Sequence, residues 1–199
     1  MNLITMMKVF IHLASFSPLL VMYIFAFSDQ LGADPVEEII HFTGVGAFNL
    51  LLLTLSASPL AKHFKASAFL KVRRLLGLYC FMYALCHVLN FIFFEIQFDW
   101  SLVLSEIIER PYITIGMVAF VLLLMLSVTS VPLFKRKMGK RWQQLHNSIY
   151  LVVLLVAIHF YWSVKSSLTS PILYFIVVLL LLALRYKKIK KLFKGNKRI

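Results

Sequence analysis

Charged residues and cysteines are both scarce in this sequence. Asp, Glu, Lys and Arg make up 15% of the 199 residues, whereas 61% are hydrophobic and the mean hydropathy is +0.86. An ordinary soluble domain is about a quarter charged, so this composition points away from a soluble domain and towards an integral membrane protein. The only cysteines, Cys80 and Cys86, share one apolar run and form no C-x-x-C pair. A disulfide, a cysteine zinc site and a covalent c-type haem attachment are therefore not expected.

Acidic residues are missing from every long apolar run. An apolar run of about 18 or more residues predicts a transmembrane helix, and about six such spans emerge. They cover roughly residues 9–27, 42–61, 75–94, 112–131, 145–164 and 171–186. The sequence thus predicts an all-α integral membrane bundle that forms a single domain over residues 1–199. Because no span contains an acid, a transporter or channel that relays protons is disfavoured.

The net charge of +13 is explained by where the charges lie. Basic residues gather in the loops 62–74 and 135–141 and in the tail from residue 185, whereas all eight acids lie in the loops 29–38 and 95–109. Only Arg110 and Lys165 are basic residues on the acidic side. By the positive-inside rule both termini are predicted to be cytoplasmic. The basic tail, residues 187–199, is predicted to contact membrane lipid, and no nucleic-acid partner is expected.

Two histidines lie deep inside apolar runs, His87 and His159. A histidine far from either end of a membrane helix is a functional candidate by default. At a rise of about 1.5 Å per residue the two sit at roughly 12 and 9 Å below the outer surface, on helices that run the same way. Similar depth on two helices is what a haem with two axial histidines requires. The alternative is that each histidine only hydrogen-bonds within the bundle.

The remaining histidines lie nearer to span ends. His146 precedes His159 by about 20 Å of helix and points about 140° away from it, unless a π-bulge realigns them. It could ligate a second haem, contact a propionate or cap the cytoplasmic mouth. Arg73 shares the face of His87 and suits a propionate or a flavin phosphate. For His12, His41 and His63 we expect interfacial solvation, and His41 stands beside the acidic outer loop.

Several motifs resemble one known family. They are G-K-R-W-Q-Q-L-H-N-x-x-Y (139–150), L-G-A-D-P-V (31–36) with H-F-T-G (41–44), R-R-L-L-G-L (73–78), E-x-x-x-R-P-Y (106–112) and A-L-R-Y-K-K (183–188). These motifs, taken in their order along the chain, resemble those of the MsrQ family. Its members are the haem-binding membrane subunits of the bacterial protein-methionine-sulfoxide reductase system. The resemblance implies a multi-pass, ferric-reductase-like transmembrane domain in a bacterial inner membrane, with b-type haem and FMN as cofactors.

Family ligand positions fall on His87, His146 and His159. The wider ferric-reductase superfamily carries four histidines in two pairs, and Arg73 or Arg74 stands here where the fourth would lie. One haem b is therefore the expected count, and a second stays open. We expect Arg73, Arg74, Arg141 and His146 to form a basic mouth that holds an anionic flavin or orients a quinol.

The resemblance also implies a function. Electrons would come from the quinone pool or a cytoplasmic flavin reductase and leave for a periplasmic molybdopterin-containing methionine-sulfoxide reductase subunit. No nucleophile–base pair and no H-E-x-x-H motif is present, so catalysis is expected to belong to that partner. The alternatives are a quinone-linked cytochrome b that serves another reductase, a haemless proton-relay or transport protein, and a haemless anchoring subunit.

Overall fold

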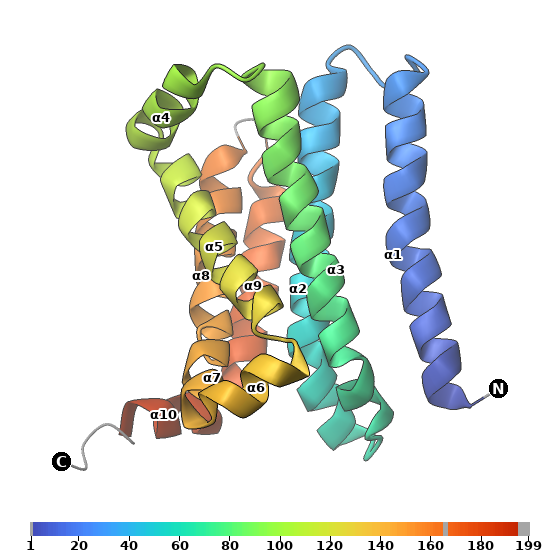
Figure 1. The fold of residues 1–199 in the computed structure, drawn as a ribbon, viewed down its shortest axis with the longest axis vertical. Helices are drawn as coiled ribbons and strands as arrows, with labels where there is room; N and C mark the ends of the chain where they lie inside the picture. Colours follow the sequence, from blue (N-terminus) through green and yellow to red (C-terminus); the bar gives the residue numbers. More distant parts are fainter. Residues whose placement is uncertain (1, 165–166, 195–199) are drawn as a thin grey trace.

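The computed structural model describes residues 2–164 and 167–194, and every regular element in those ranges is helical. The long helices are α1 (Leu3–Phe27), α2 (Pro35–His63), α3 (Ala68–Asn90), α5 (Pro111–Val128), α8 (Ile149–Ser163) and α9 (Thr169–Ala183). The short elements are the π-helical turn η1 (Phe91–Glu95), α4 (Trp100–Glu109), α6 (Pro132–Met138), α7 (Lys140–His146) and α10 (Tyr186–Lys194). Figure 1 shows the long helices side by side, with α1 at one edge of the bundle. The all-α prediction is confirmed.

The prediction of about six membrane spans is confirmed by length and composition. Five segments are long and apolar enough to cross a membrane, namely Leu3–Phe27, Pro35–His63, Ala68–Glu95, Pro111–Val128 and Lys140–Ser163. The helices α9 and α10 make a sixth span if they are counted together, and they are bent by 69° at their junction. The chain is thus a multi-pass membrane protein. Lys165 and residues 195–199 of the predicted basic tail lie outside the described residues.

Capping residues start several helices earlier than hydropathy alone predicted. The Asn2 side chain accepts the Ile4 N–H at 3.0 Å, and Asp34 accepts the Glu37 N–H at 2.9 Å. Pro35 then occupies the first turn of α2, where its missing N–H costs nothing. The helices therefore extend beyond the apolar runs into the region where caps can meet water.

The predicted span at 145–164 is interrupted, which corrects the sequence-based expectation of one continuous helix. A turn at Asn147 and Ser148 separates α7 from α8. The N–H of Ser148 bonds to the carbonyl of Leu145, three residues back, and not four. Before α7, Gly139 adopts φ +53°, a conformation that residues with a Cβ rarely adopt. The chain thus reaches α8 through the two short helices α6 and α7.

A second difference is α4, which lies in the loop predicted between the third and fourth spans. Asp99 caps this helix by accepting the N–H groups of Ser101 and Leu102. At 10 residues the segment is too short to register as a membrane span, which is why hydropathy missed it. It brings Arg110 and Tyr112 to the start of α5.

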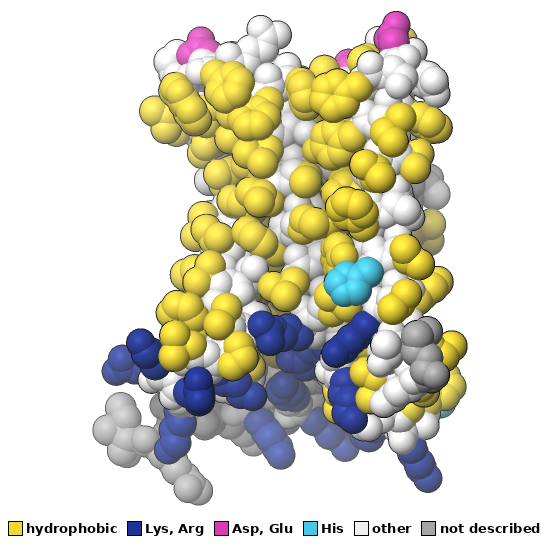
Figure 2. All heavy atoms as spheres, turned by 45° about the vertical axis from the view of Figure 1, so that its right-hand side comes forward, with side chains coloured by type: hydrophobic (Ala, Val, Ile, Leu, Met, Phe, Trp, Pro, Cys, Tyr) yellow, Lys and Arg dark blue, Asp and Glu magenta, His cyan; other side chains and the backbone are white. Residues whose placement is uncertain are grey.

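Charges occupy opposite ends of the bundle and an apolar surface lies between them (Figure 2). We call these the basic end and the acidic end. The start of α1 and α10 both lie at the basic end (Figure 1). The positive-inside rule predicts that this end faces the cytoplasm. In the interior, Phe48 and Leu51 of α2 pack with Val152 and Val153 of α8 and Val178 of α9, and all are nearly inaccessible.

Helix α1 is tied to α3 by three polar contacts along its length. They join His12 Nδ1 to the Tyr79 hydroxyl at 2.6 Å, the Tyr83 hydroxyl to the Ser15 carbonyl at 2.7 Å, and the Tyr23 hydroxyl to Asn90 Oδ1 at 2.8 Å. Hydrogen bonds of this kind help hold helices together in lipid, where the hydrophobic effect between helices is absent. His12 is exposed on the bundle surface, and it has a protein partner in Tyr79 that the sequence did not reveal.

Candidate functional site

The structure brings the imidazole rings of His87 in α3 and His159 in α8 close together. Their ring centroids lie 6.1 Å apart, and the ring planes cross at 83°. The two histidines belong to helices that are distant in sequence. Helix α3 packs most extensively on α2, and α8 packs most extensively on α5. The sequence predicted that these two histidines would meet, and they do.

Each of the two imidazoles is oriented by a backbone carbonyl of the neighbouring helix. His87 Nδ1 lies 2.9 Å from the Ile40 oxygen, and His159 Nδ1 lies 2.7 Å from the Tyr112 oxygen. A carbonyl only accepts, so Nδ1 must carry the proton in both rings. Nε2 of each neutral ring is then left with its lone pair available. Metal-binding histidines are oriented in this way by a second hydrogen bond.

A glycine lies against each ring, one helical turn after the carbonyl. A Cβ built on Gly44 would lie 3.0 Å from the His87 ring, and one built on Gly116 would lie 2.8 Å from the His159 ring. Any side chain at these positions would push on the imidazole. The glycines thus allow each histidine to pack directly on its partner helix.

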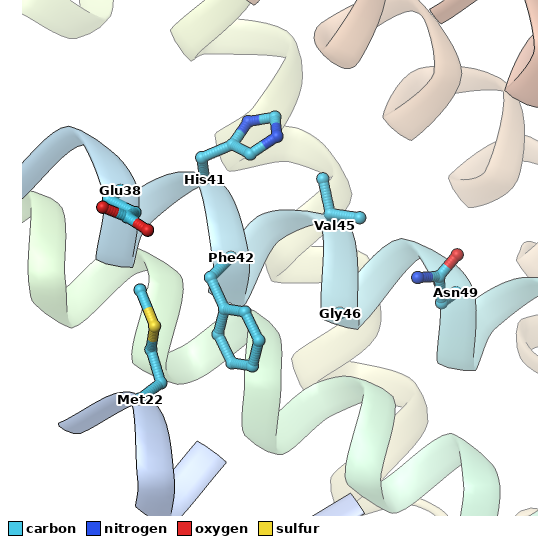
Figure 3. A pocket seen from close by; sticks show the side chains of 7 residues that line it. All are labelled: Met22, Glu38, His41, Phe42, Val45, Gly46 and Asn49. Carbon is cyan, nitrogen blue, oxygen red and sulfur yellow. The ribbon is translucent and has the colours of Figure 1, made fainter. Parts of the chain in front are cut away.

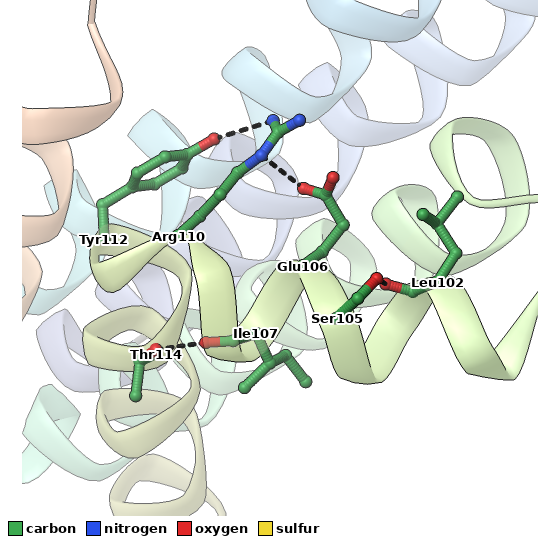
Figure 4. Close-up of polar contacts among 7 residues, drawn as sticks. All are labelled: Leu102, Ser105, Glu106, Ile107, Arg110, Tyr112 and Thr114. Atoms are coloured by element: carbon green, nitrogen blue, oxygen red, sulfur yellow. Dashed lines mark hydrogen bonds and ion pairs between the residues drawn. The ribbon is translucent and has the colours of Figure 1, made fainter.

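The corner between α4 and α5 positions Tyr112. Arg110 pairs with Glu106 at 2.7 Å and donates from Nη1 to the Tyr112 hydroxyl at 3.3 Å. The Thr114 hydroxyl bonds to the Ile107 carbonyl across the same corner. Figure 4 shows Arg110 lying between Glu106 and Tyr112. The corner therefore fixes the residue whose carbonyl orients His159.

The separation of the two rings matches that of two imidazoles that ligate one metal from opposite sides. Two imidazole–metal bonds of about 2 Å each, together with the two ring radii, give a centroid separation of roughly 6 Å. Within the described ranges no cluster of three or more His, Cys, Asp or Glu residues could hold a metal. A metal between the two rings would need its other ligands from a macrocycle, and a haem supplies them.

His146 lies apart from this pair, at the basic end. Its Nε2 is 3.0 Å from the Thr129 hydroxyl, and its ring stacks on Trp142 with centroids 4.0 Å apart. The single hydroxyl proton of Thr129 goes to the Met125 carbonyl at 2.6 Å, so Nε2 of His146 donates to Thr129. This tautomer is the opposite of that of His87 and His159. The contact fastens α7 to the end of α5.

The three predicted arginines also lie at the basic end. Arg73 is half-buried, donates to the Ser58 hydroxyl at 3.4 Å and lies within electrostatic reach of His146. Arg74 and Arg141 are exposed. The structure therefore places Arg73 near His146 and leaves the other two on the surface of the same end.

Arg185 is a site residue that sequence reasoning missed, because it was grouped with the exposed basic tail. Only 8% of it is exposed, and it donates to the Leu55 carbonyl and to the Tyr150 hydroxyl at 3.1 Å. Leu55 has a free carbonyl because Pro59, four residues on, lacks the N–H that would bond to it. Two features of the sequence could have indicated this contact. Pro59 lies inside one apolar run and leaves a carbonyl unbonded, and Arg185 lies inside another apolar run.

Comparisons with known proteins agree with this arrangement. A family described as "Ferric reductase like transmembrane component" matches residues 42–157. The chain is also 46% identical over 189 residues to the "Protein-methionine-sulfoxide reductase heme-binding subunit MsrQ" of Salmonella paratyphi B, and the same holds for the proteins of that name from Salmonella newport and Salmonella agona. These alignments cover 94% of this chain and 95% of each relative. The chain therefore belongs to the MsrQ family of protein-methionine-sulfoxide reductase heme-binding subunits.

Proposed function

We propose that the protein is an electron-transfer subunit that holds one haem b between His87 and His159. It takes electrons from the quinone pool or a cytoplasmic flavin reductase. It passes them to a periplasmic molybdopterin-containing methionine-sulfoxide reductase subunit, and so supports the repair of oxidised periplasmic proteins. The chain itself is non-catalytic and resides in a bacterial inner membrane. The names of the relatives support the reductase system and the cofactor.

The observation that carries this proposal is the close pair of imidazoles. Both rings keep Nδ1 protonated by donating to a carbonyl, which leaves the Nε2 lone pair of each ring without this partner, and the two ring centroids lie 6.1 Å apart. Bound haem supplies a one-electron iron couple whose potential depends on the axial ligands and on burial. The residues of this chain orient the ligands, keep water away from the site and fix the distance between the two helices.

The two ends of the bundle suit different partners. At the basic end, Arg73, Arg74 and Arg141 with His146 offer positive charge to an anionic donor such as FMN, whose phosphate a guanidinium binds in a bidentate manner. At the acidic end, the exposed residues Glu37, Glu38 and Glu109 offer negative charge to a periplasmic partner. Opposite charges on two such surfaces steer association. Because Nε2 of His146 is engaged by Thr129, we propose a single haem.

The test is a dithionite-reduced minus oxidised visible spectrum of the purified full-length protein, together with a pyridine haemochrome assay that counts haem. We expect a sharp reduced α-band of the b type and one haem per chain. His87→Ala and His159→Ala should each abolish the band while the protein still inserts into the membrane.

His63→Ala is the matched control, since His63 lies at the basic end of α2 and stacks only on Phe64 within the described residues. It should keep the spectrum unchanged. A well-folded, haem-supplied protein without colour would refute the proposal, as would full haem retention in both pair variants.

A further inference from the structure

A groove on the side of α2 lies near the acidic end of the bundle. It has a volume of about 300 Å³ and is lined by Met22 of α1 and by Glu38, His41, Phe42, Val45, Gly46 and Asn49 of α2. Figure 3 shows Glu38, His41, Val45 and Asn49 following one another along the helix, with Met22 reaching across from α1 towards Phe42. Glu38, His41 and Asn49 are exposed, so the groove opens on the surface of the bundle.

Polar groups lie at both ends of this groove, and at the inner end Asn49 accepts a hydrogen bond from the Tyr174 hydroxyl through Oδ1 at 2.7 Å. Glu38 and His41 lie towards the acidic end, and the apolar side chains of Met22, Phe42 and Val45 follow inward. One Glu38 oxygen, Oε2, accepts the Gly32 N–H at 3.1 Å, and the other has no partner among the described residues. No lysine or arginine lines the groove. It therefore offers hydrogen-bond acceptors beside an apolar channel, and nothing that would attract an anionic head group.

The polar part of the groove lies next to the histidine pair. Ile40, which precedes His41, is the residue whose carbonyl accepts the Nδ1 proton of His87. The His41 ring itself lies 6.2 Å from the Phe160 ring, and Phe160 follows His159 in the chain. A ligand at His41 would therefore be one residue away from the carbonyl that orients His87, and it would lie near the aromatic ring that follows His159 in the chain.

A second groove of similar size provides the comparison. It has a volume of about 330 Å³ and is lined by Ile107, Thr114, Met117, Val118, Val121 and Leu122. Its only hydroxyl, that of Thr114, is already bonded to the Ile107 carbonyl. This groove offers apolar surface alone and suits a lipid tail. The α2 groove differs from it by the carboxylate and the imidazole.

We propose that the α2 groove binds the head group of a lipid-soluble hydroquinone. The two hydroxyls of a hydroquinone donate hydrogen bonds that Glu38 and His41 accept, and the apolar tail lies along Phe42 and Val45 towards the membrane interior. The volume suits a single ring, because ligand pockets start at about 300 Å³. The inference rests on the proposed function for its choice of donor. It assigns the quinone-pool donor to the acidic end, and not to the basic mouth that the sequence favoured.

The test uses the purified full-length protein in nanodiscs and a photoreactive azido derivative of decylubiquinol kept reduced under anaerobic conditions. After illumination, labelled peptides are mapped by mass spectrometry, and unlabelled decylubiquinol serves as competitor. We expect the label on residues 38–49 of α2 and displacement by the competitor. Val45→Phe, which fills the groove, should weaken competition about tenfold.

Two further variants make the result decisive. His41→Leu removes an acceptor on the surface and should also weaken competition about tenfold, whereas Val118→Phe fills the second groove and should change nothing. Equal labelling of the wild type, Val45→Phe and His41→Leu would overturn the inference. So would a label that maps to α5, or one that added phospholipid displaces as well as decylubiquinol does.

Haem content, measured by pyridine haemochrome on the same samples, separates this inference from the proposed function. A haem-containing protein that fails to bind the probe in the α2 groove refutes the groove alone. A colourless, folded protein refutes the haem assignment whatever the labelling shows.

Discussion

His87 and His159 are held by the same device at the same sequence spacing. Each ring donates through Nδ1 to the carbonyl of the residue 47 positions earlier, Ile40 for His87 and Tyr112 for His159. Each ring also packs on a glycine four residues after that carbonyl, Gly44 or Gly116. The helix pairs α2–α3 and α5–α8 thus position one imidazole each by the same backbone contact.

The glycines beside the rings should be intolerant of any side chain. Gly116→Ala places a Cβ 2.8 Å from the His159 ring, and Gly44→Ala places one 3.0 Å from the His87 ring. Overpacking of this kind costs about 1–3 kcal/mol, and we expect a shifted α-band or reduced haem content in both variants, with the larger effect in Gly116→Ala. The measurements are the visible spectrum and the thermal unfolding midpoint.

Gly77→Ala is the matched control for the glycine variants. A Cβ at Gly77 of α3 meets only Thr54, at an ordinary contact distance of 3.8 Å. Its spectrum should match that of the wild type. If Gly116→Ala were equally silent, the close packing of the ring on α5 would play no part in cofactor binding.

His146 should prove to be a structural residue. His146→Ala removes the hydrogen bond to Thr129 and the stacking on Trp142, and we expect a loss of about 0.5–1.5 kcal/mol of stability with an unchanged haem count. Thr129→Val should reproduce the loss. A haemochrome assay that finds half the haem in His146→Ala would instead assign His146 an iron of its own.

Arg185 should stabilise the protein through the carbonyl that Pro59 leaves free. Arg185→Met leaves the buried Leu55 carbonyl and the Tyr150 hydroxyl without this partner, at a cost of about 1–3 kcal/mol. Pro59→Ala restores an N–H four residues after Leu55, so the double variant should recover part of that loss. The coupling, about 0.5–3 kcal/mol, can be read from unfolding in detergent.

Arg74→Met serves as the control for Arg185, since Arg74 is exposed and its replacement should change stability by less than about 0.5 kcal/mol. Strict additivity of Arg185→Met and Pro59→Ala would show that the freed carbonyl is not what the guanidinium satisfies.

Helix α4 should loosen in acid. The hydroxyl of Ser101, followed by the N–H of Leu102, lowers the pKa of the Asp99 carboxyl. The stabilisation by a group with a lowered folded pKa is complete above its ordinary value of about 3.9 and disappears as the pH falls through the lower folded value. The protection of the Ser101 and Leu102 amides, measured relative to the intrinsic exchange rate at each pH, should therefore fall at low pH. Asp99→Asn keeps an acceptor at the cap and should remove this pH dependence.

Hydropathy, charge and the depth of two histidines were enough to predict the bundle and its central pair. These signals are local in the sequence. An apolar run predicts a membrane span, and a polar residue inside such a run is easily recognised. Arg185 was misplaced because its partners, Leu55 and Tyr150, come from helices far away in sequence, and no local pattern records such contacts. The turn at Asn147 and Ser148 was missed for a different reason, since hydropathy does not register a break of two residues.

The roles predicted for Arg74 and Arg141 remain predictions, because exposure at the basic end is compatible with many partners. The orientation of the bundle in the membrane also remains a prediction, and it rests on the charge asymmetry. His41 shows how context changes an interpretation. From the sequence alone it was interpreted as an interfacial histidine, whereas in the structure it lines a groove and directly follows Ile40, whose carbonyl orients His87.

The bond between Leu55 and Arg185 also constrains how the protein is made. The acceptor is synthesised 130 residues before its donor, and chains emerge from the ribosome N-terminal end first. Helix α2 therefore enters the bilayer with one backbone carbonyl unsatisfied, in a solvent that offers it no hydrogen bond. Arg185, which follows α9, removes this defect, so the carbonyl is satisfied only once α9 has arrived beside α2.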